Sequence, residues 1–560
     1  MRRLWNGLGI LAVVAGVGYA LFDHYKYHIP GIISRWRDPI APNHPITWSP
    51  GPATVAAASK RPPNIIVILA DDMGYNDISL FGGGVGGGAV PTPNIDSIGR
   101  QGASFDTGYA ANATCSPSRA AIMTGRYPTR FGFEFTAVPV VFARAVSRGE
   151  HAAAQDRPAG IFHEERTKGL IDYPDMGVPH SEITIADLLR SNGYHTMQIG
   201  KWHLGEAKPL QPNGQGFDEA LGFLAGGGMF MPQDDPGVVN AKLPWDPIDR
   251  FLWPNLPYAV QWNGGQRFAP KGHLTDYWTD NAVAAIKANR NRPFFLYLAY
   301  NAPHTPLQAT KADYDALPQI KDHTTRVYGA MIRQLDRGVG RVLQTLKDQG
   351  IDDNTLVIFT SDNGGAWYTG LAESNAPFRG YKATYFEGGL RVPFLLRWPG
   401  RITPGTRVPG PAHHLDIFAT AAAAAGVPMP ADRPMDGVSL LASVAAGTGA
   451  TAAATRVPHD RLFWRSGDNK VVRDGAWKLQ IAAKPNAAWL YDLSTDPTER
   501  RNLAAAQPAR VTAMRAMIAA HDRDAARKPL WPALIEAPIR IDVPLNTPWK
   551  RGQEYVYWSN

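Results

Sequence analysis

Three short apolar runs have the pattern of strands that are buried on both faces. They are rich in β-branched and aromatic residues and do not alternate between polar and apolar positions. The runs cover residues 65–70, 294–299 and 355–360. Strands of this kind occur in parallel sheets that are covered by helices on both sides. We therefore expect a large, mostly parallel central sheet.

Stretches with helical periodicity lie between these runs. Apolar residues recur every three or four positions in residues 183–191, 279–289 and 328–349, which indicates helices with one buried face. The alternation of strands and helices predicts an α/β sandwich with helices on both sides of one sheet. We place this main domain at residues 62–445.

The pattern changes after the main domain. Residues 445–455 are rich in Ala, Gly and Thr and form a candidate linker. Short strand-like runs follow at residues 462–464, 470–472 and 477–480, and a helical pattern covers residues 508–527. We therefore predict a smaller C-terminal domain at residues 456–560, with a helix packed on a short antiparallel sheet.

The N-terminus has the composition of an export signal. Arg2 and Arg3 precede an apolar stretch at residues 8–22, and Gly18 and Ala20 offer a small-x-small cleavage site. We expect residues 1–22 to be a signal peptide or an uncleaved membrane anchor, followed by a linker at residues 23–61. Either alternative predicts an exported protein, which we place in a bacterial periplasm or on a membrane facing it.

Composition narrows the functional classes. The chain has 560 residues, of which 44% are hydrophobic and 19% charged, so it can bury a large core. The formal charge of +8 is scattered along the sequence, and we expect no nucleic-acid site. A single cysteine excludes an intramolecular disulfide and a Cys-rich zinc site.

Polar residues follow each buried strand run. Asp71 and Asp72 follow the first run, His304 lies after the second, and Asp362 and Asn363 follow the third. The carboxyl ends of parallel strands meet at one edge of a sheet, which is where ligands bind in α/β folds. An all-oxygen set of carboxylates and an amide suits Ca²⁺, and it suits Mg²⁺ less because Mg²⁺ prefers to retain water in a strict octahedron.

Cys115 lies immediately ahead of a predicted helix. Ser116 and Pro117 suit its N-cap and first position, so the thiol would lie beside unpaired N–H groups that favour negative charge. An isolated cysteine is more often a small buried hydrophobic residue without a chemical role. By itself, the residue therefore favours the inert alternative.

The surrounding motif resembles the signature of the formylglycine-dependent sulfatases. Cys115-Ser-Pro-Ser-Arg119 is followed by Thr124-Gly125, with Met123 where the family usually has Leu. Further segments that resemble family motifs occur in the family's order at residues 200–205 (Gly-Lys-Trp-His-Leu-Gly), 303–306 (Pro-His-Thr-Pro), 379–389 and 490–503. The resemblance implies an arylsulfatase-like sulfuric ester hydrolase with the alkaline-phosphatase-like fold.

The resemblance also implies a role for each matching residue. A formylglycine-generating enzyme would act on residues 115–119 and oxidise Cys115 to the aldehyde. The implied metal ligands are Asp71, Asp72, Asp362, Asn363 and the modified Cys115. The implied catalytic residues are Cys115, Arg119, Lys201, His203, His304 and Lys382.

In the implied reaction, one hydroxyl of the hydrated aldehyde attacks the sulfur of a small-molecule or saccharide sulfate ester and expels the alcohol. His304 or Lys382 would protonate the leaving oxygen, and His203 would take a proton from the second hydroxyl so that sulfate leaves. The alternative is a phosphate or phosphonate ester hydrolase on the same scaffold, because tetrahedral oxyanions of similar size fit the same cationic groups.

Overall fold

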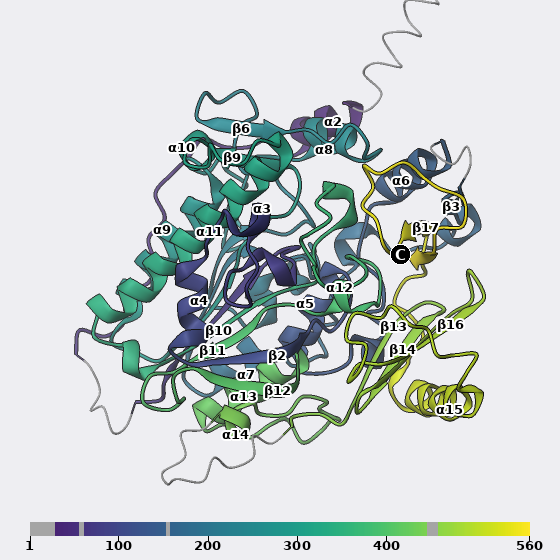
Figure 1. Ribbon diagram of the computed structural model, residues 1–560. Coiled ribbons are helices and arrows are strands. Elements are labelled where there is room, and N and C mark those ends of the chain that lie inside the picture. The colour runs from purple at the N-terminus through teal and green to yellow at the C-terminus, as the bar shows by residue number, and fades with distance from the viewer. Residues whose placement is uncertain (1–27, 55–60, 153–156, 445–456) are drawn as a thin grey trace, which may run out of the picture.

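The computed structural model describes residues 28–54, 61–152, 157–444 and 457–560 and confirms the predicted α/β sandwich (Figure 1). In these residues the central sheet has nine strands, and most of its neighbouring pairs are parallel. In spatial order the strands are β12 (Thr406–His413), β2 (Ala103–Tyr109), β11 (Phe394–Arg397), β10 (Thr355–Ser361), β1 (Asn64–Ala70), β8 (Phe294–Ala299), β4 (His195–Lys201), β5 (Glu219–Phe223) and β7 (Gln261–Trp262).

Alternate side chains of β1 enter opposite cores, as expected for a strand buried on both faces. Ile66 and Ile68 pack in the core that contains residues of α4 (Pro93–Arg100), α9 (Leu274–Asn289) and α11 (His323–Asp348). Ile65 and Val67 pack in the core that contains residues of α5 (Cys115–Thr124), α7 (Ile185–Ser191) and α13 (Leu415–Ala425). The sheet is therefore held between two helical layers.

Helix boundaries differ from the prediction by up to five residues, mainly at the N-termini. Helix α9 begins at Leu274, where the His273 side chain accepts from the Thr275 N–H, and α11 begins at His323, capped by Asp322. Helix α7 begins later than expected, because Thr184 and Asp187 form a capping box. Periodicity follows the buried face, whereas the capping residue decides where each helix starts.

The C-terminal domain contains the predicted antiparallel sheet and helix. Its strands are β13 (Arg461–Ser466), β14 (Asn469–Asp474), β15 (Trp477–Ala482) and β16 (Ala487–Asp492). Helix α15 (Pro508–Ala525) packs Met514 and Ile518 against this sheet. A second sheet joins β3 (Ile161–Phe162), β17 (Ile535–Arg540) and β18 (Tyr555–Ser559), so the end of the chain returns to the main domain. The candidate linker at residues 445–455 lies outside the described residues.

Smaller elements complete the described chain. They are α2 (Ile29–Arg37), α3 (Val85–Gly88), α6 (Val140–Ala152), α8 (Asp249–Asn255), α10 (Lys311–Asp315), α12 (Glu387–Leu390), α14 (Leu441–Val444), β6 (Val238–Ala241) and β9 (Leu307–Thr310).

Part of the expected N-terminal linker lies against the main domain, which differs from the free tether that we expected. The Trp48 side chain is buried and packs edge-on against Trp262. Ser49 donates backbone and side-chain hydrogen bonds to Glu219. Isolated aromatic residues in a Pro-rich stretch gave no periodic signal, although one of them buries a large apolar surface. The predicted signal peptide or anchor at residues 1–22 lies outside the described residues.

Candidate active site

The ends of β1 and β10 bring the predicted carboxylates together. These strands are parallel neighbours, with Ala70 opposite Ser361, so the residues that follow them emerge side by side. The backbone N–H of Asp72 donates to Asp362 Oδ1 at 3.2 Å. Asp72 has a φ of 63°, a conformation that is costly for a non-glycine residue and is often found at functional sites.

Cys115 lies at the first position of α5, facing these carboxylates. Its Sγ is 3.7 Å from Asp71 Oδ1 and 3.9 Å from Asp72 Oδ1. The predicted cap at Ser116 is wrong. Thr114 adopts the extended N-cap conformation instead, and Cys115 is the first helical residue. The thiol therefore lies at the positive end of a buried helix.

Three cationic side chains surround the three carboxylates. Arg119 Nε donates to Asp362 Oδ2 at 2.9 Å, and Lys201 Nζ is 2.8 Å from Asp71 Oδ2. Lys382 Nζ is 2.7 Å from Asp72 Oδ1. Segments far apart in the sequence thus converge on one buried, charge-dense centre next to the thiol.

The two histidines differ in their electrostatic surroundings. Burial lowers the pKa of His203 well below its ordinary value, and the positive charges of Lys201 and Arg119 lower it further. Burial opposes a charge on His304 as well, but the nearby carboxylates of Asp72 and Asp71 outweigh it and raise its pKa. Relative to a free imidazole, the surroundings therefore favour the neutral form of His203 and the charged form of His304.

His304 lies close to the carboxylates. Its Nε2 is 3.6 Å from Asp72 Oδ2. Ligand atoms of Asp71, Asp72, Cys115 and His304 lie within 4.8 Å of one another. Asp362 is not in this group. It accepts hydrogen bonds from Arg119 Nε and from the backbone N–H of Asp72.

The donor set fits a divalent cation. Asn363 is fully buried, and its Nδ2 donates to Asp72 Oδ1 at 2.8 Å. Its Oδ1 has no hydrogen-bond partner among the described residues, and an unfilled buried acceptor is costly unless a ligand occupies it. An amide oxygen beside carboxylate oxygens is a hard donor set of the kind that Ca²⁺ binds.

Sequence reasoning did not identify Tyr368 as part of this centre. Its hydroxyl donates to Asp72 Oδ2 at 2.8 Å and accepts from Lys382 Nζ at 3.2 Å. The residue lies five positions after Asn363, in a short 3₁₀ turn (Trp367–Thr369). A single tyrosine in a Gly-rich segment carries no periodic signal, so only the folded loop shows its role in positioning Lys382.

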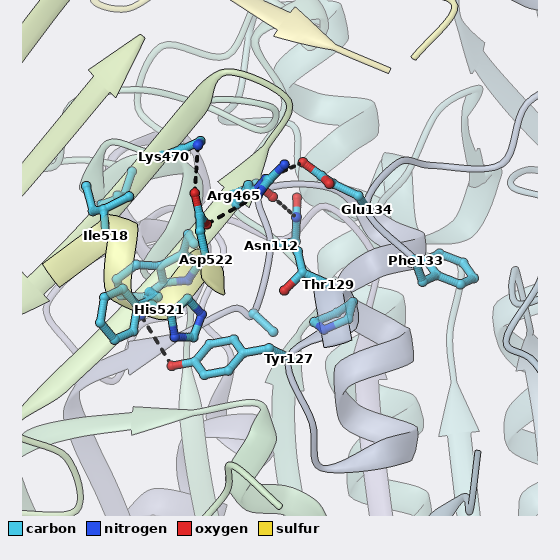
Figure 2. Close-up of a pocket in the computed structure, with 15 residues that line it drawn as sticks. Asn112, Tyr127, Thr129, Phe133, Glu134, Arg465, Lys470, Ile518, His521 and Asp522 are labelled. Carbon is cyan, nitrogen blue, oxygen red and sulfur yellow. Dashed lines mark hydrogen bonds and ion pairs between the residues drawn. The ribbon is translucent and has the colours of Figure 1, made fainter. Parts of the chain in front are cut away.

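A cavity between the main and C-terminal domains is too small for a substrate. Figure 2 shows Arg465 directed toward both Glu134 and Asp522, with Lys470 also paired to Asp522. The cavity has a volume of about 20 Å³, which holds about one water molecule. We therefore assign this region to domain packing and not to the reaction.

Comparison with known proteins gives consistent matches. The Sulfatase family model matches residues 63–427, and a model described as N-sulphoglucosamine sulphohydrolase, C-terminal, matches residues 381–521. N-acetylgalactosamine-6-sulfatase from Homo sapiens is 34% identical over 404 residues, which cover 70% of this chain and 67% of that protein. Steryl-sulfatase from Mus musculus is 32% identical over 455 residues, covering 69% and 65%.

A solved structure has the same architecture over most of the chain. Ps i-CgsB in complex with k-i-k-neocarrahexaose is 31% identical and aligns with a TM-score of 0.68, covering 84% of this chain and 95% of that one. BT4656 in complex with its substrate, D-glucosamine-2-N,6-O-disulfate, aligns with a TM-score of 0.59 at 20% identity. The second alignment shows a shared fold only.

Proposed function

This chain belongs to the sulfatase family and is a sulfate ester hydrolase, and we propose that its substrates are saccharide sulfate monoesters and its nucleophile a formylglycine made from Cys115. The position of Cys115 is the observation that carries the nucleophile. Burial would raise the pKa of its thiol, but the charges of Lys201 and Lys382 outweigh burial and lower it. The side chain lies where developing negative charge is stabilised.

The saccharide part of the proposal rests on similar proteins. N-acetylgalactosamine-6-sulfatase is named for a sulfated sugar, and Ps i-CgsB was solved with k-i-k-neocarrahexaose bound. Each is more than 30% identical to this chain over most of its length.

We infer that Ca²⁺ is held by Asp71, Asp72, Asp362 and Asn363 beside residue 115. When bound, the cation would supply charge that lowers the pKa of the nucleophilic hydroxyl and offsets the charge of the sulfate oxygens. Arg119 holds Asp362 in place through its Nε. Lys201 and Lys382 supply N–H donors to the sulfate oxygens.

The pKa directions support an assignment of the acid and base roles. His203 is kept neutral, and its buried Nδ1 has no hydrogen-bond partner among the described residues, so the ring can accept a proton. Lys382 has a pKa well above its ordinary value: burial opposes its charge, but Asp72 outweighs burial, so the ammonium releases a proton poorly. We therefore propose His304 as the general acid, because its neighbouring carboxylates raise its pKa while an imidazolium still has a lower intrinsic pKa than an ammonium.

We also propose that the formylglycine-generating enzyme acts before the chain folds and is exported. Cys115 is only 3% exposed, which supports modification of an unfolded segment. The N-terminal sequence supports export to the periplasm.

The test combines mass and activity measurements on protein from the native host. The tryptic peptide that contains Cys115 should be lighter by about 18 Da, the change on converting a thiol side chain to an aldehyde. Cys115→Ala should lower turnover of a sulfated saccharide at least about a thousandfold, with little change in melting temperature. An unmodified thiol in fully active enzyme would disprove the proposed nucleophile.

A matched pair of substrates tests the reaction class. A sulfate ester and a phosphate ester with the same leaving group should be hydrolysed at different rates, with sulfate preferred. A large preference for phosphate would favour the alternative phosphate or phosphonate ester hydrolase.

A further inference from the structure

Helix α2 carries an apolar face that is exposed. Ile29, Ile32, Ile33 and Trp36 are 39%, 55%, 43% and 82% exposed. These positions are spaced by three and four residues, so their side chains lie along one side of the helix. Four large apolar side chains on nine residues form a continuous stripe and not scattered surface residues.

The opposite side of α2 is fixed to the protein. Gly31 is buried against the end of α8, and a Cβ atom at this position would lie 2.4 Å from the Pro254 carbonyl oxygen. Arg35, one turn further on, donates to the same carbonyl at 3.3 Å. Figure 1 shows α2 beside α8 at the rim of the molecule. Because Gly31 and Arg35 define the inner side, the apolar stripe is held outward.

The sequence next to α2 indicates what covers the stripe. The apolar stretch at residues 8–22 ends seven residues before Ile29, and seven extended residues span at most about 25 Å. Any membrane that holds this stretch is therefore within reach of α2. Tyr25, Tyr27 and Trp36 are residues that favour the interface between lipid and water.

The charge around α2 suits an anionic surface. A cavity of about 760 Å³ between α2 and α8 is lined by four basic residues, His28, Arg35, Lys242 and Arg250. Two carboxylates, Asp246 and Asp249, also line it, and they are outnumbered by the cations of Arg35, Lys242 and Arg250. Basic side chains beside an apolar helical face are typical of helices that lie in the headgroup region.

We propose that α2 is a membrane-surface helix, which inserts Ile29, Ile32, Ile33 and Trp36 into an anionic lipid bilayer. Among the described residues, no helix is long and apolar enough to cross a bilayer. The helix would act with the apolar stretch at residues 8–22 as a second contact and would fix the orientation of the catalytic domain on the membrane. This proposal is independent of the reaction at Cys115.

The single cysteine of the chain permits a direct test. Cys115 is buried, so a cysteine placed on α2 would be the accessible thiol for an environment-sensitive dye. We would label Ile33→Cys, on the apolar stripe, and Ser34→Cys, an exposed position on the other side of the helix. The full-length variants are reconstituted into vesicles of phosphatidylcholine and phosphatidylglycerol, with or without a lipid-borne quencher. Unmutated protein gives the background from Cys115.

The dye at Ile33→Cys should be quenched at least about twofold more than the dye at Ser34→Cys, because only the first would be inserted in lipid. Equal quenching at both positions, or none at Ile33→Cys, would overturn the proposal. Disulfide cross-linking between Ile33→Cys copies at low protein density would also overturn it, because a second copy would then cover the stripe. Turnover of a soluble sulfate ester should be unchanged in both labelled variants, which verifies that they are folded.

Discussion

Two buried ion networks in this protein differ in whether their acceptor atoms are filled. The catalytic network consists of Asp71, Asp72, Asp362, Arg119, Lys201 and Lys382. The second network, here called the seam cluster, consists of Glu387, Arg391, Lys478 and Glu499 and joins the main domain to the C-terminal domain. Both are almost completely shielded from solvent.

The carboxylate acceptors of the seam cluster are filled, whereas one donor, Arg391 Nε, has no hydrogen bond and lies 3.0 Å from Glu387 Oε2 as an ion pair. Lys478 Nζ lies 2.8 Å from Glu387 Oε1 and 3.0 Å from Glu499 Oε1. Glu499 Oε2 accepts from the backbone N–H of Glu387, at the first residue of α12. This hydrogen bond joins the C-terminal domain to the segment that follows the Lys382 loop.

A perturbed pKa does not distinguish the two networks. Burial would raise the pKa of Glu387, but Lys478 and Arg391 outweigh it and lower the value to about 2. Burial raises the pKa of Asp362 to about 6. The catalytic network differs in having the Cys115 thiol beside it and, in the adjoining Asn363 Oδ1, an acceptor that no described residue fills. Unfilled acceptors are therefore the better sign of a ligand site here.

Removal of the seam cation should produce the largest change in stability. Lys478→Met would leave two buried carboxylates without their shared partner, and breaking a buried ion pair in this way costs about 3–5 kcal/mol. We expect a clearly lower denaturation midpoint, with activity per folded molecule largely retained. Lys470→Met is the matched control, because its pair with Asp522 is partly exposed and should contribute at most about 1 kcal/mol. Equal midpoints in the two variants would contradict this interpretation.

Removal of the unfilled acceptor should weaken cation binding. In Asn363→Ala, half-maximal activity should require about 10–100 times more Ca²⁺, the scale of effect seen when metal-site groups are removed. The measurement is activity against Ca²⁺ concentration after chelation.

Asn375 provides the control for the loop. It holds the same segment by hydrogen bonds with the backbone of Gly365 and Gly380. Asn375→Ala should lower the melting temperature and leave the Ca²⁺ requirement unchanged. A shift of the same size in both variants would indicate a loop effect instead of a lost ligand.

Asp77 should affect the pH dependence of stability, because its buried carboxyl is held by neutral donors. It accepts from Tyr328 Oη, Ser374 Oγ and the Gly74 N–H, and burial raises its pKa from 3.8 to about 7. Its protonated form stabilises the fold fully below pH 3.8, and this contribution is lost as the pH rises through about 7. The slope is at most about 1.4 kcal/mol per pH unit.

Asp77→Asn should flatten this dependence, because the amide does not titrate. Melting temperatures of the variant and the unmutated protein should therefore respond differently between about pH 5 and about pH 8. Identical pH profiles for the two proteins would show that Asp77 does not titrate in this range.

Much of the fold was predictable because buried strands have a strong local signal. The run at residues 65–70 differs from β1 by one residue, and the polar residues after β1 and β10 were expected to meet because parallel ends share an edge. The cap at Thr114 was missed, because three of the residues near this helix start are acceptable N-caps and only backbone angles select one. Tyr368 was missed because its partners are 296 and 14 positions away.

The sequence by itself determined the α/β architecture, the family motifs and the two strand ends that carry the carboxylates. These features depend on local composition and on the rule that parallel strands end together. Tertiary structure decided which buried charges are matched, in which direction the pKa of each histidine is shifted and which side of α2 faces outward. Those properties depend on distances between residues that are remote in sequence, and electrostatic energy and burial are set by such distances.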